Sequence, residues 1–164
     1  MNPSVWWARE PGRHEVRLHA RGVDIFDHNY KPIPGTDPQK YRTAYDRECE
    51  RDLQPLYDRL VEETAGGAFA LCIDERTYAP THNSKYSRPP TGDRAVDLVA
   101  SRDKRMFTDT TGTRAAQNRA RFLLQTYRRD TGEILNDLSM PIEVGGRHWG
   151  CLRFGFKPEV LLDS

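Results

Sequence analysis

The sequence has no long apolar run, no strong net charge and no apolar segment at residues 1–9. No stretch approaches the roughly 18 consecutive apolar residues that a membrane-spanning helix needs, and residues 1–9 lack the apolar segment of a signal peptide. The 25 lysines and arginines nearly balance the 24 aspartates and glutamates, so no global field attracts nucleic acid or an anionic membrane. We therefore expect a cytoplasmic protein with no nucleic-acid partner and no membrane partner.

Paired cysteines and catalytic motifs are also missing. Cys49, Cys72 and Cys151 are odd in number and widely spaced, which argues against a disulfide framework and against a zinc site. There is no G-x-S-x-G, P-loop, H-E-x-x-H or dinucleotide-binding fingerprint. Without such a motif, His82, Cys72 and Asp137 are only loose candidates for a catalytic group. We expect buried thiols, no metal and no enzyme activity.

What the sequence does contain is apolar periodicity of two kinds. Apolar residues recur every three or four positions from Thr36 to about Thr64, which predicts a long helix that Pro55 kinks or divides. Residues 82–119 are rich in Pro, Gly, Ser and Asp and predict a partly helical crossover. Short apolar or alternating runs predict five strands, at 68–73, 77–81, 122–129, 134–144 and 148–156.

This order of elements resembles the α+β plan of PAS and Cache sensor domains. The resemblance implies a five-stranded antiparallel sheet, a long N-terminal helix and a helical crossover that covers one face and leaves a pocket beneath it. We expect an N-terminal arm over residues 1–35, the sensor domain over 36–157 and a C-terminal tail over 158–164.

Several short segments of the sequence support a narrower resemblance. They lie at 26–36, 80–83, 86–87, 101–107, 123–130, 137–142 and 146–150. Together they resemble a sensor-type extension of bacterial methyl-accepting chemotaxis proteins. That resemblance implies a cytosolic sensing domain that works with a chemoreceptor signalling domain or a histidine-kinase array. The long heptad helices of a receptor signalling hairpin are absent, so we expect a sensor that signals in trans or forms part of a longer receptor.

The richest polar cluster joins the end of the second predicted strand to the crossover. Its members are His82, Asn83, Tyr86, Arg102, Lys104 and Arg105. Arginine presents a planar fork that fits a carboxylate or a phosphate, and lysine adds a point charge. We therefore expect a small anionic ligand here. The alternative is a solvated charged helix face, or ion pairs with the neighbouring aspartates Asp97, Asp103 and Asp109.

Three further candidates lie on the predicted strands. Alternation places Gln125 and Tyr127 on one face of their strand, where they either orient a ligand or form ordinary surface. Asp137 interrupts an apolar strand, and an ionised carboxylate there must be solvated, paired or ligand-binding. A pair with Arg147 or Arg153 on the next strand is the structural alternative to a ligand site.

His148 and Trp149 begin the last predicted strand. They form either an aromatic wall of the pocket or a hydrogen-bonded edge of the sheet. Haem is a rival cofactor, because His28, His82 and His148 are possible axial ligands. The sequence contains no C-x-x-C-H attachment motif and does not select among these three histidines.

The sequence thus favours a cytosolic small-molecule-binding sensor for chemotaxis-type signal transduction. One alternative is a haem-binding redox or gas sensor. Another is a dimerising scaffold without a ligand, because the aromatic stripe of the long helix can pair with its copy in a homodimer.

Overall fold

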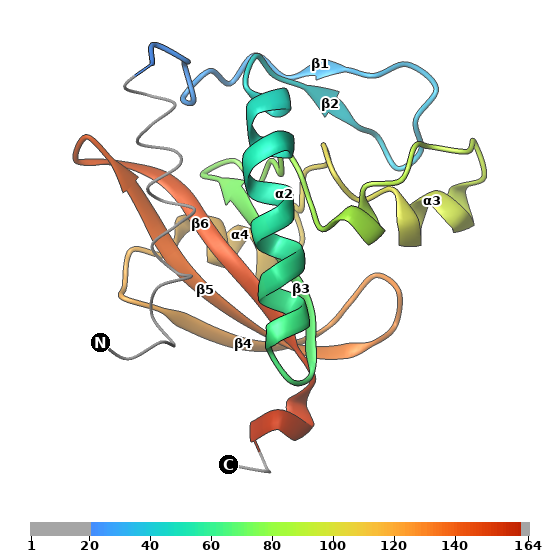
Figure 1. Ribbon diagram of the computed structural model, residues 1–164, viewed down its shortest axis with the longest axis vertical. Coiled ribbons are helices and arrows are strands. Elements are labelled where there is room, and N and C mark those ends of the chain that lie inside the picture. The colour runs from blue at the N-terminus through green and yellow to red at the C-terminus, as the bar shows by residue number, and fades with distance from the viewer. Residues whose placement is uncertain (1–20, 162–164) are drawn as a thin grey trace.

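The centre of the fold is a four-stranded antiparallel sheet (Figure 1). In the computed structural model, which describes residues 21–161, the strands lie in the order β3-β6-β5-β4. Their bounds are β3 (Gly67–Asp74), β4 (Leu123–Arg128), β5 (Ile134–Val144) and β6 (Arg147–Phe156). A separate two-stranded sheet pairs β1 (Lys31–Pro32) with β2 (Tyr41–Arg42). The chain is therefore α+β, as expected.

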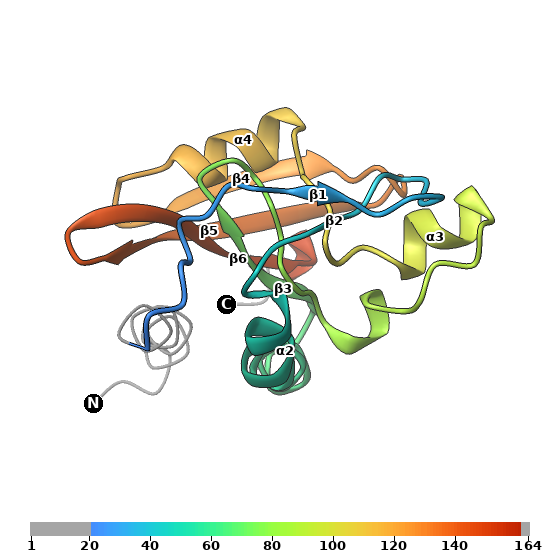
Figure 2. The ribbon, with the colours of Figure 1, turned by 90° about the horizontal axis from the view of Figure 1, so that it is seen from above.

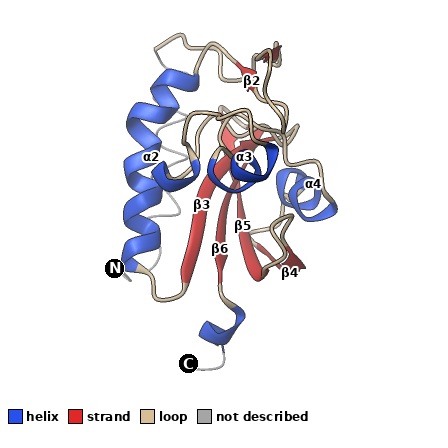
Figure 3. Cartoon of the chain, turned by 90° about the vertical axis from the view of Figure 1, so that its right-hand side faces the viewer, coloured by secondary structure: helices blue, strands red, loops and turns tan. Residues whose placement is uncertain are grey.

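Helices cover both faces of the main sheet. The long helix α2 (Asp46–Glu63) runs along β3, and the short helix α4 (Thr110–Gln117) lies on the opposite face (Figures 2 and 3). Helix α3 (Arg94–Ala100) and the 3₁₀ turn η2 (Ser84–Tyr86) belong to the crossover between β3 and β4, and η3 (Pro158–Leu161) follows β6. Within residues 21–161, no helix is long and apolar enough to cross a membrane.

Local sequence explains where the crossover helices begin. The Asp93 side chain accepts hydrogen bonds from the backbone N–H groups of Ala95 and Val96, and thereby caps α3. Asp109 caps α4 in the same way by accepting the N–H of Gly112. These caps satisfy backbone donors that have no partner inside the first turn of a helix. Asp109 also lines the cavity described below.

The long helix starts later than the sequence suggests. We expected it to begin near Thr36, but it begins at Asp46. Residues 31–42 form the β1–β2 sheet instead, and Thr36 closes the loop between the two strands by donating to the Ile33 carbonyl and accepting from the Lys40 N–H. From Asp46 the helix continues through Pro55 to Glu63 without being divided.

The expectation of a five-stranded sheet is wrong, because residues 77–81 do not join it. Asp74 ends β3 and its Oδ1 accepts from the N–H groups of Arg76 and Tyr78, which turns the chain away. Residues 77–79 then bond to the crossover: the Ala79 N–H donates to the Arg105 carbonyl, and the Phe107 N–H donates to the Thr77 carbonyl. The backbone groups that would have built the fifth strand are used there.

Side chains occupy the edge of β3 where a fifth strand would have paired. The Cys72 N–H donates to the Tyr57 hydroxyl of α2 at 3.0 Å, and the Ala70 N–H donates to Oδ1 of Asn83 at 2.8 Å. Unpaired strand edges invite pairing with other chains, and natural sheets cover them. Asn83 and Tyr57 therefore take over the role of a neighbouring strand.

The N-terminal arm expected over residues 1–35 is described from residue 21 onward; its first twenty residues, and residues 162–164 of the expected tail, lie outside the described part. Within residues 21–35, Ile25 is fully buried in the core. The Tyr30 hydroxyl donates to Asp74 at the end of β3. This segment therefore packs directly on the sheet.

Candidate functional site

A pocket of about 500 Å³ lies between the crossover and the sheet face that α4 covers. Its floor comprises Phe69 and Leu71 of β3, Tyr127 of β4 and Arg153 of β6. Leu71 pairs with Arg153 across the two strands, so the register itself places both side chains on this face. The volume falls within the usual range of small-molecule sites.

The walls come from three consecutive parts of the chain. The crossover contributes His82, Arg102, Arg105, Phe107, Thr108 and Asp109. Helix α4 contributes Thr110 and Thr111, and the end of β4 with its following turn contributes Arg128, Arg129 and Asp130. Lys104 separates the two crossover arginines and has a positive φ of 58°. That left-handed residue turns the backbone, so Arg102 and Arg105 both reach the pocket and Lys104 does not.

Positive charge dominates the lining, which has five arginines and two aspartates. Two of the arginines are matched by carboxylates beside the pocket. Arg153 is 2.8 Å from Asp137, which is completely buried, and Arg129 is 3.1 Å from Glu133. Because a carboxylate balances the charge of each of these two arginines, the net positive charge of the pocket depends on the other arginines.

Arg102 and Arg105 share a single carboxylate. Nη1 of Arg102 is 2.9 Å from Oδ1 of Asp130, and Nη2 of Arg105 is 3.4 Å from Oδ2 of the same residue. Burial of Asp130 opposes its ionisation, but both arginines favour it and hold the pKa of this carboxyl below its usual range. Two cations therefore face one anion.

Each of these arginines also has a buried donor without a partner among the described residues. The donors are Nε of Arg102 and Nη1 of Arg105. Both side chains are almost completely enclosed, with 5% and 10% of their surface exposed. Burial, followed by repulsion from Arg129, lowers the pKa of Arg102; burial, followed by repulsion from Arg102, lowers that of Arg105. Buried polar groups in native proteins nearly always have partners, so these donors mark a place for an acceptor.

Aromatic rings hold the guanidinium groups in position. The Phe107 ring lies 5.6 Å from the guanidinium carbon of Arg102 and 5.4 Å from that of Arg105. On the floor, Phe69 lies 5.2 Å from Arg129 and 5.9 Å from Arg153. Cation–π contacts of this kind restrict the flexible arginine side chains, which prepares their free donors for a ligand.

His82 is neutral in this setting. Burial, together with the positive charges of Arg102, Arg129 and Arg153, lowers its pKa well below the usual 6.5. Its Nδ1 accepts the backbone N–H of Asn83 at 2.7 Å. Nε2 therefore carries the proton of the neutral ring, and His82 adds an uncharged donor to the wall.

Four of the eleven residues predicted from the sequence line the pocket: His82, Arg102, Arg105 and Tyr127. Burial is the largest influence on Tyr127 and raises its pKa to about 12, so its hydroxyl stays protonated. Tyr86 stands immediately behind the wall, 4.9 Å from the His82 ring and 5.3 Å from Arg129. It supports the lining without being part of it.

The other predicted residues have partners elsewhere. Asn83 bonds to the edge of β3, as described above, and Lys104 pairs with Asp103 at 2.8 Å. Gln125 faces α4 and donates to the Thr111 carbonyl, so it holds the helix that carries part of the wall. Asp137 pairs with Arg153, one of the two partners expected for it.

His148 and Trp149 lie in the interior and do not line the pocket. Nε2 of His148 is 2.7 Å from the Ala116 carbonyl at the end of α4. The Trp149 indole donates to the Ile25 carbonyl at 2.8 Å and anchors the segment that precedes β1. Both residues therefore connect β6 to the elements packed around it.

Several lining residues were not predicted from the sequence, chiefly Phe69, Phe107, Arg129, Asp130 and Arg153. Arg153 had a usable signal, because it interrupts an otherwise apolar strand as Asp137 does. Arg129 and Asp130 follow a strand at a turn, where charged residues are common and carry no such signal.

The described residues contain no group of three or more His, Cys, Asp or Glu side chains placed to hold a metal ion. The three histidines considered as haem ligands each contact a different part of the molecule. His82 is in the pocket wall, His148 contacts α4, and His28 lies 3.6 Å from Glu75. No shared site brings these rings together.

Comparison with known proteins leaves the family open. No family matches the sequence, and no curated protein matches it. Among solved structures, the fold is similar to an extracellular ligand binding receptor from Desulfohalobium retbaense DSM5692, with a TM-score of 0.44 and 9% identical residues. The similarity covers 96% of this chain and 25% of that one, so the chain spans about a quarter of its length. At this distance the likeness carries no argument about function.

Proposed function

We propose that this chain is a cytosolic sensor module that binds a small anionic molecule in the pocket beneath the crossover. The observation that carries the proposal is the pair Arg102 and Arg105, two buried cations that share the carboxylate of Asp130 and retain free donors. An uncompensated buried charge is costly. An anionic group of a ligand supplies an acceptor for the free donors and an opposite charge for the two arginines.

The rest of the lining suits a ligand of mixed character. Phe69, Leu71 and Phe107 offer apolar contact, whereas the hydroxyl groups of Thr108 and Tyr127 offer hydrogen bonds. Small-molecule sites commonly combine an apolar wall with a few fixed polar groups. The positive charge selects the sign of the ligand, and the apolar floor favours a carbon skeleton beside the anionic group.

We propose binding and not catalysis. Of the three loose catalytic candidates in the sequence, only His82 lines the pocket. Its Nδ1 is occupied by the Asn83 N–H, which disfavours a role as general base through that nitrogen. A link to chemotaxis-type output, through a receptor signalling domain or a histidine-kinase array, is supported by the sequence resemblance alone.

The proposal is tested by thermal unfolding in the presence of succinate, citrate and inorganic phosphate, with succinamide as the uncharged control. We expect the anions to raise the unfolding midpoint and succinamide to leave it unchanged. A ligand at 100 times its dissociation constant adds about 2.7 kcal/mol to the free energy of unfolding. An equal response to succinamide, or no response to any anion, contradicts the proposal.

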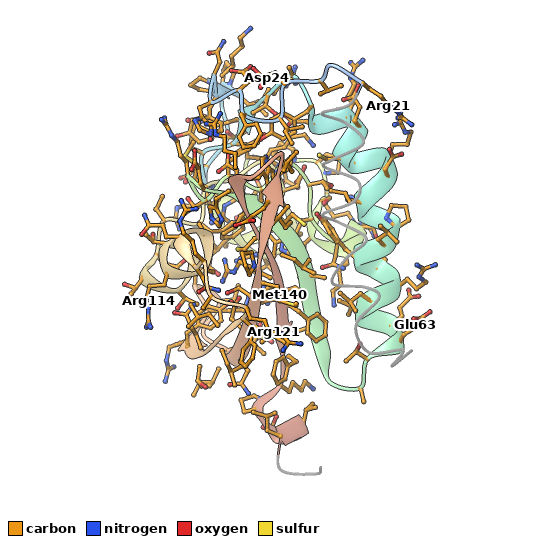
Figure 4. All side chains as sticks on the ribbon, turned by 90° about the vertical axis from the view of Figure 1, so that its left-hand side faces the viewer. Arg21, Asp24, Glu63, Arg114, Arg121 and Met140 are labelled. Atoms are coloured by element: carbon orange, nitrogen blue, oxygen red, sulfur yellow. The ribbon has the colours of Figure 1, made fainter. Side chains whose placement is uncertain are left out.

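A matched pair of variants locates the binding. The double variant Arg102→Gln with Arg105→Gln should lose the anion response. Arg114→Gln should retain it, because Arg114 is exposed and projects from the outer side of α4 (Figure 4). Loss of the response in both variants would show that the anions act on the overall charge and not in the pocket.

A further inference from the structure

The turn between β4 and β5 places a carboxylate where a ligand's own anionic group would bind. Asp130 lies in this turn, and 36% of its side chain is exposed. Each of its two oxygens contacts a different arginine, Oδ1 with Arg102 and Oδ2 with Arg105. A carboxylate bridging two guanidinium groups is the contact that an incoming carboxylate or phosphate would also make.

We infer that Arg102 and Arg105 form the subsite for a terminal oxyanion of the ligand, and that Asp130 occupies this subsite until the ligand displaces it. This inference rests on the proposed function and deepens it: it names the ligand group, a carboxylate or phosphate, and the residue with which that group competes.

Three features of the contact between Asp130 and the two arginines indicate that a ligand displaces Asp130 and does not simply bind beside it. The Arg105–Asp130 distance of 3.4 Å is long for a charge-assisted bond. Asp130 is also far more exposed than the arginines, so water readily solvates it when it leaves. Finally, Nε of Arg102 and Nη1 of Arg105 are left without partners. The resident carboxylate thus satisfies the subsite only in part.

Displacement would also affect the backbone of the turn. Two hydrogen bonds close it: the Arg129 N–H donates to the Glu133 carbonyl, and the Gly132 N–H donates to the Arg129 carbonyl. The two Asp130 ion pairs tie this turn to the crossover. When a ligand replaces Asp130 on the two arginines, the turn loses both ion pairs to the crossover. Binding in the pocket thereby makes the surface turn between β4 and β5 more mobile.

Affinity measurements on the full chain test the inference, with succinate and inorganic phosphate as separate probes for the carboxylate and the phosphate. Asp130→Asn removes the competing charge and should bind the fitting probe about tenfold more tightly than the natural sequence does. Glu143→Gln is the control, because it removes an exposed carboxylate of β5 that does not line the pocket. It should change the affinity by about twofold or less.

Hydrogen exchange provides a second readout that needs no variant. Saturating probe should accelerate exchange of the Arg129 and Gly132 amides, whereas a ligand that simply adds to the site would protect them. If the natural sequence binds a probe but Asp130→Asn binds it no more tightly, or if the turn becomes protected, the inference fails and the proposed function stands. If neither protein binds either probe, the proposed function fails as well.

Discussion

Arg153 and Asp137 form the most enclosed ion pair in the described structure. Nε and Nη2 of Arg153 each lie 2.8 Å from Oδ2 of Asp137, on neighbouring strands β6 and β5. Burial alone lowers the pKa of Arg153, but the Asp137 carboxylate outweighs it and raises that pKa above its usual range. The guanidinium group that forms part of the pocket floor is therefore fixed from below by a buried anion.

Replacing one partner of this pair should be costly. Asp137→Asn leaves Arg153 charged and uncompensated in the interior, and we expect the free energy of unfolding to fall by about 3–5 kcal/mol. Urea denaturation of both proteins measures the difference. The double variant Asp137→Leu with Arg153→Met removes both charges and should be clearly more stable than Asp137→Asn. A loss of less than about 1 kcal/mol in the single variant would show that the pair is solvated.

The sheet was largely predictable from the sequence, because alternation and turn residues are local signals. The strand predicted over 134–144 is confirmed as β5, and the strand predicted over 148–156 corresponds to β6, which begins one residue earlier at Arg147. The prediction of a fifth strand failed because residues 77–79 bond to Arg105 and Phe107, which lie more than twenty residues further along the chain. Local patterns do not specify such pairings.

The sequence predicted the chemistry of the candidate site better than it predicted which residues line it. The run of basic residues at 102–105 pointed to an anionic ligand, and two of its three cations line the pocket. The exception is Lys104, which the positive φ of its backbone turns away. Arg153 comes from a strand whose register sets its direction, and register is a property of the assembled sheet. Arg129 lies in the turn after β4, and its place beside the pocket depends on how that turn packs against the crossover.

The edge of β3 gives a second prediction. Tyr57→Phe removes the hydroxyl that accepts the buried Cys72 N–H. We expect the free energy of unfolding to fall by about 1–3 kcal/mol, and the Cys72 amide to exchange faster with solvent. Both quantities are measurable by denaturation and by hydrogen exchange.

Tyr86→Phe is the matched control for this edge. The Tyr86 hydroxyl donates to the Ala68 carbonyl of β3 at 3.3 Å, so the loss of this hydroxyl removes no acceptor from a backbone N–H group. The cost should stay below about 1 kcal/mol. An unchanged exchange rate of the Cys72 amide in Tyr57→Phe would contradict the assigned role of Tyr57.

A third prediction concerns the stability of the ligand-free pocket. Burial lowers the pKa of Arg105, repulsion from Arg102 lowers it further, and the ion pair with Asp130 is long at 3.4 Å. Arg105→Met keeps much of the side-chain volume and removes the charge, so we expect the ligand-free protein to become more stable by up to about 1 kcal/mol. The same variant should lose anion binding. Arg114→Met should change neither property, and a less stable Arg105→Met would contradict the prediction.

The last prediction concerns pH and follows from His82. Its folded-state pKa lies well below 6.5, whereas in the unfolded chain the imidazole takes its ordinary value of about 6.5. Between these values the unfolded state binds a proton that the folded state does not. The contribution of His82 is therefore fully present above about pH 6.5 and is lost as the pH falls through the window below it, by up to about 1.4 kcal/mol per pH unit.

His82→Asn separates this effect from the titration of other groups. The asparagine amide oxygen can accept the Asn83 N–H in place of Nδ1, but it does not titrate. Chemical denaturation between about pH 7.5 and pH 5 should show a steeper loss of stability in the natural sequence than in the variant. Because a bound anion favours the protonated imidazole, saturating succinate should make the slope of the natural sequence shallower. Equal slopes in the two ligand-free proteins would mean that His82 titrates normally, and that the surrounding arginines do not act on it as the structure indicates.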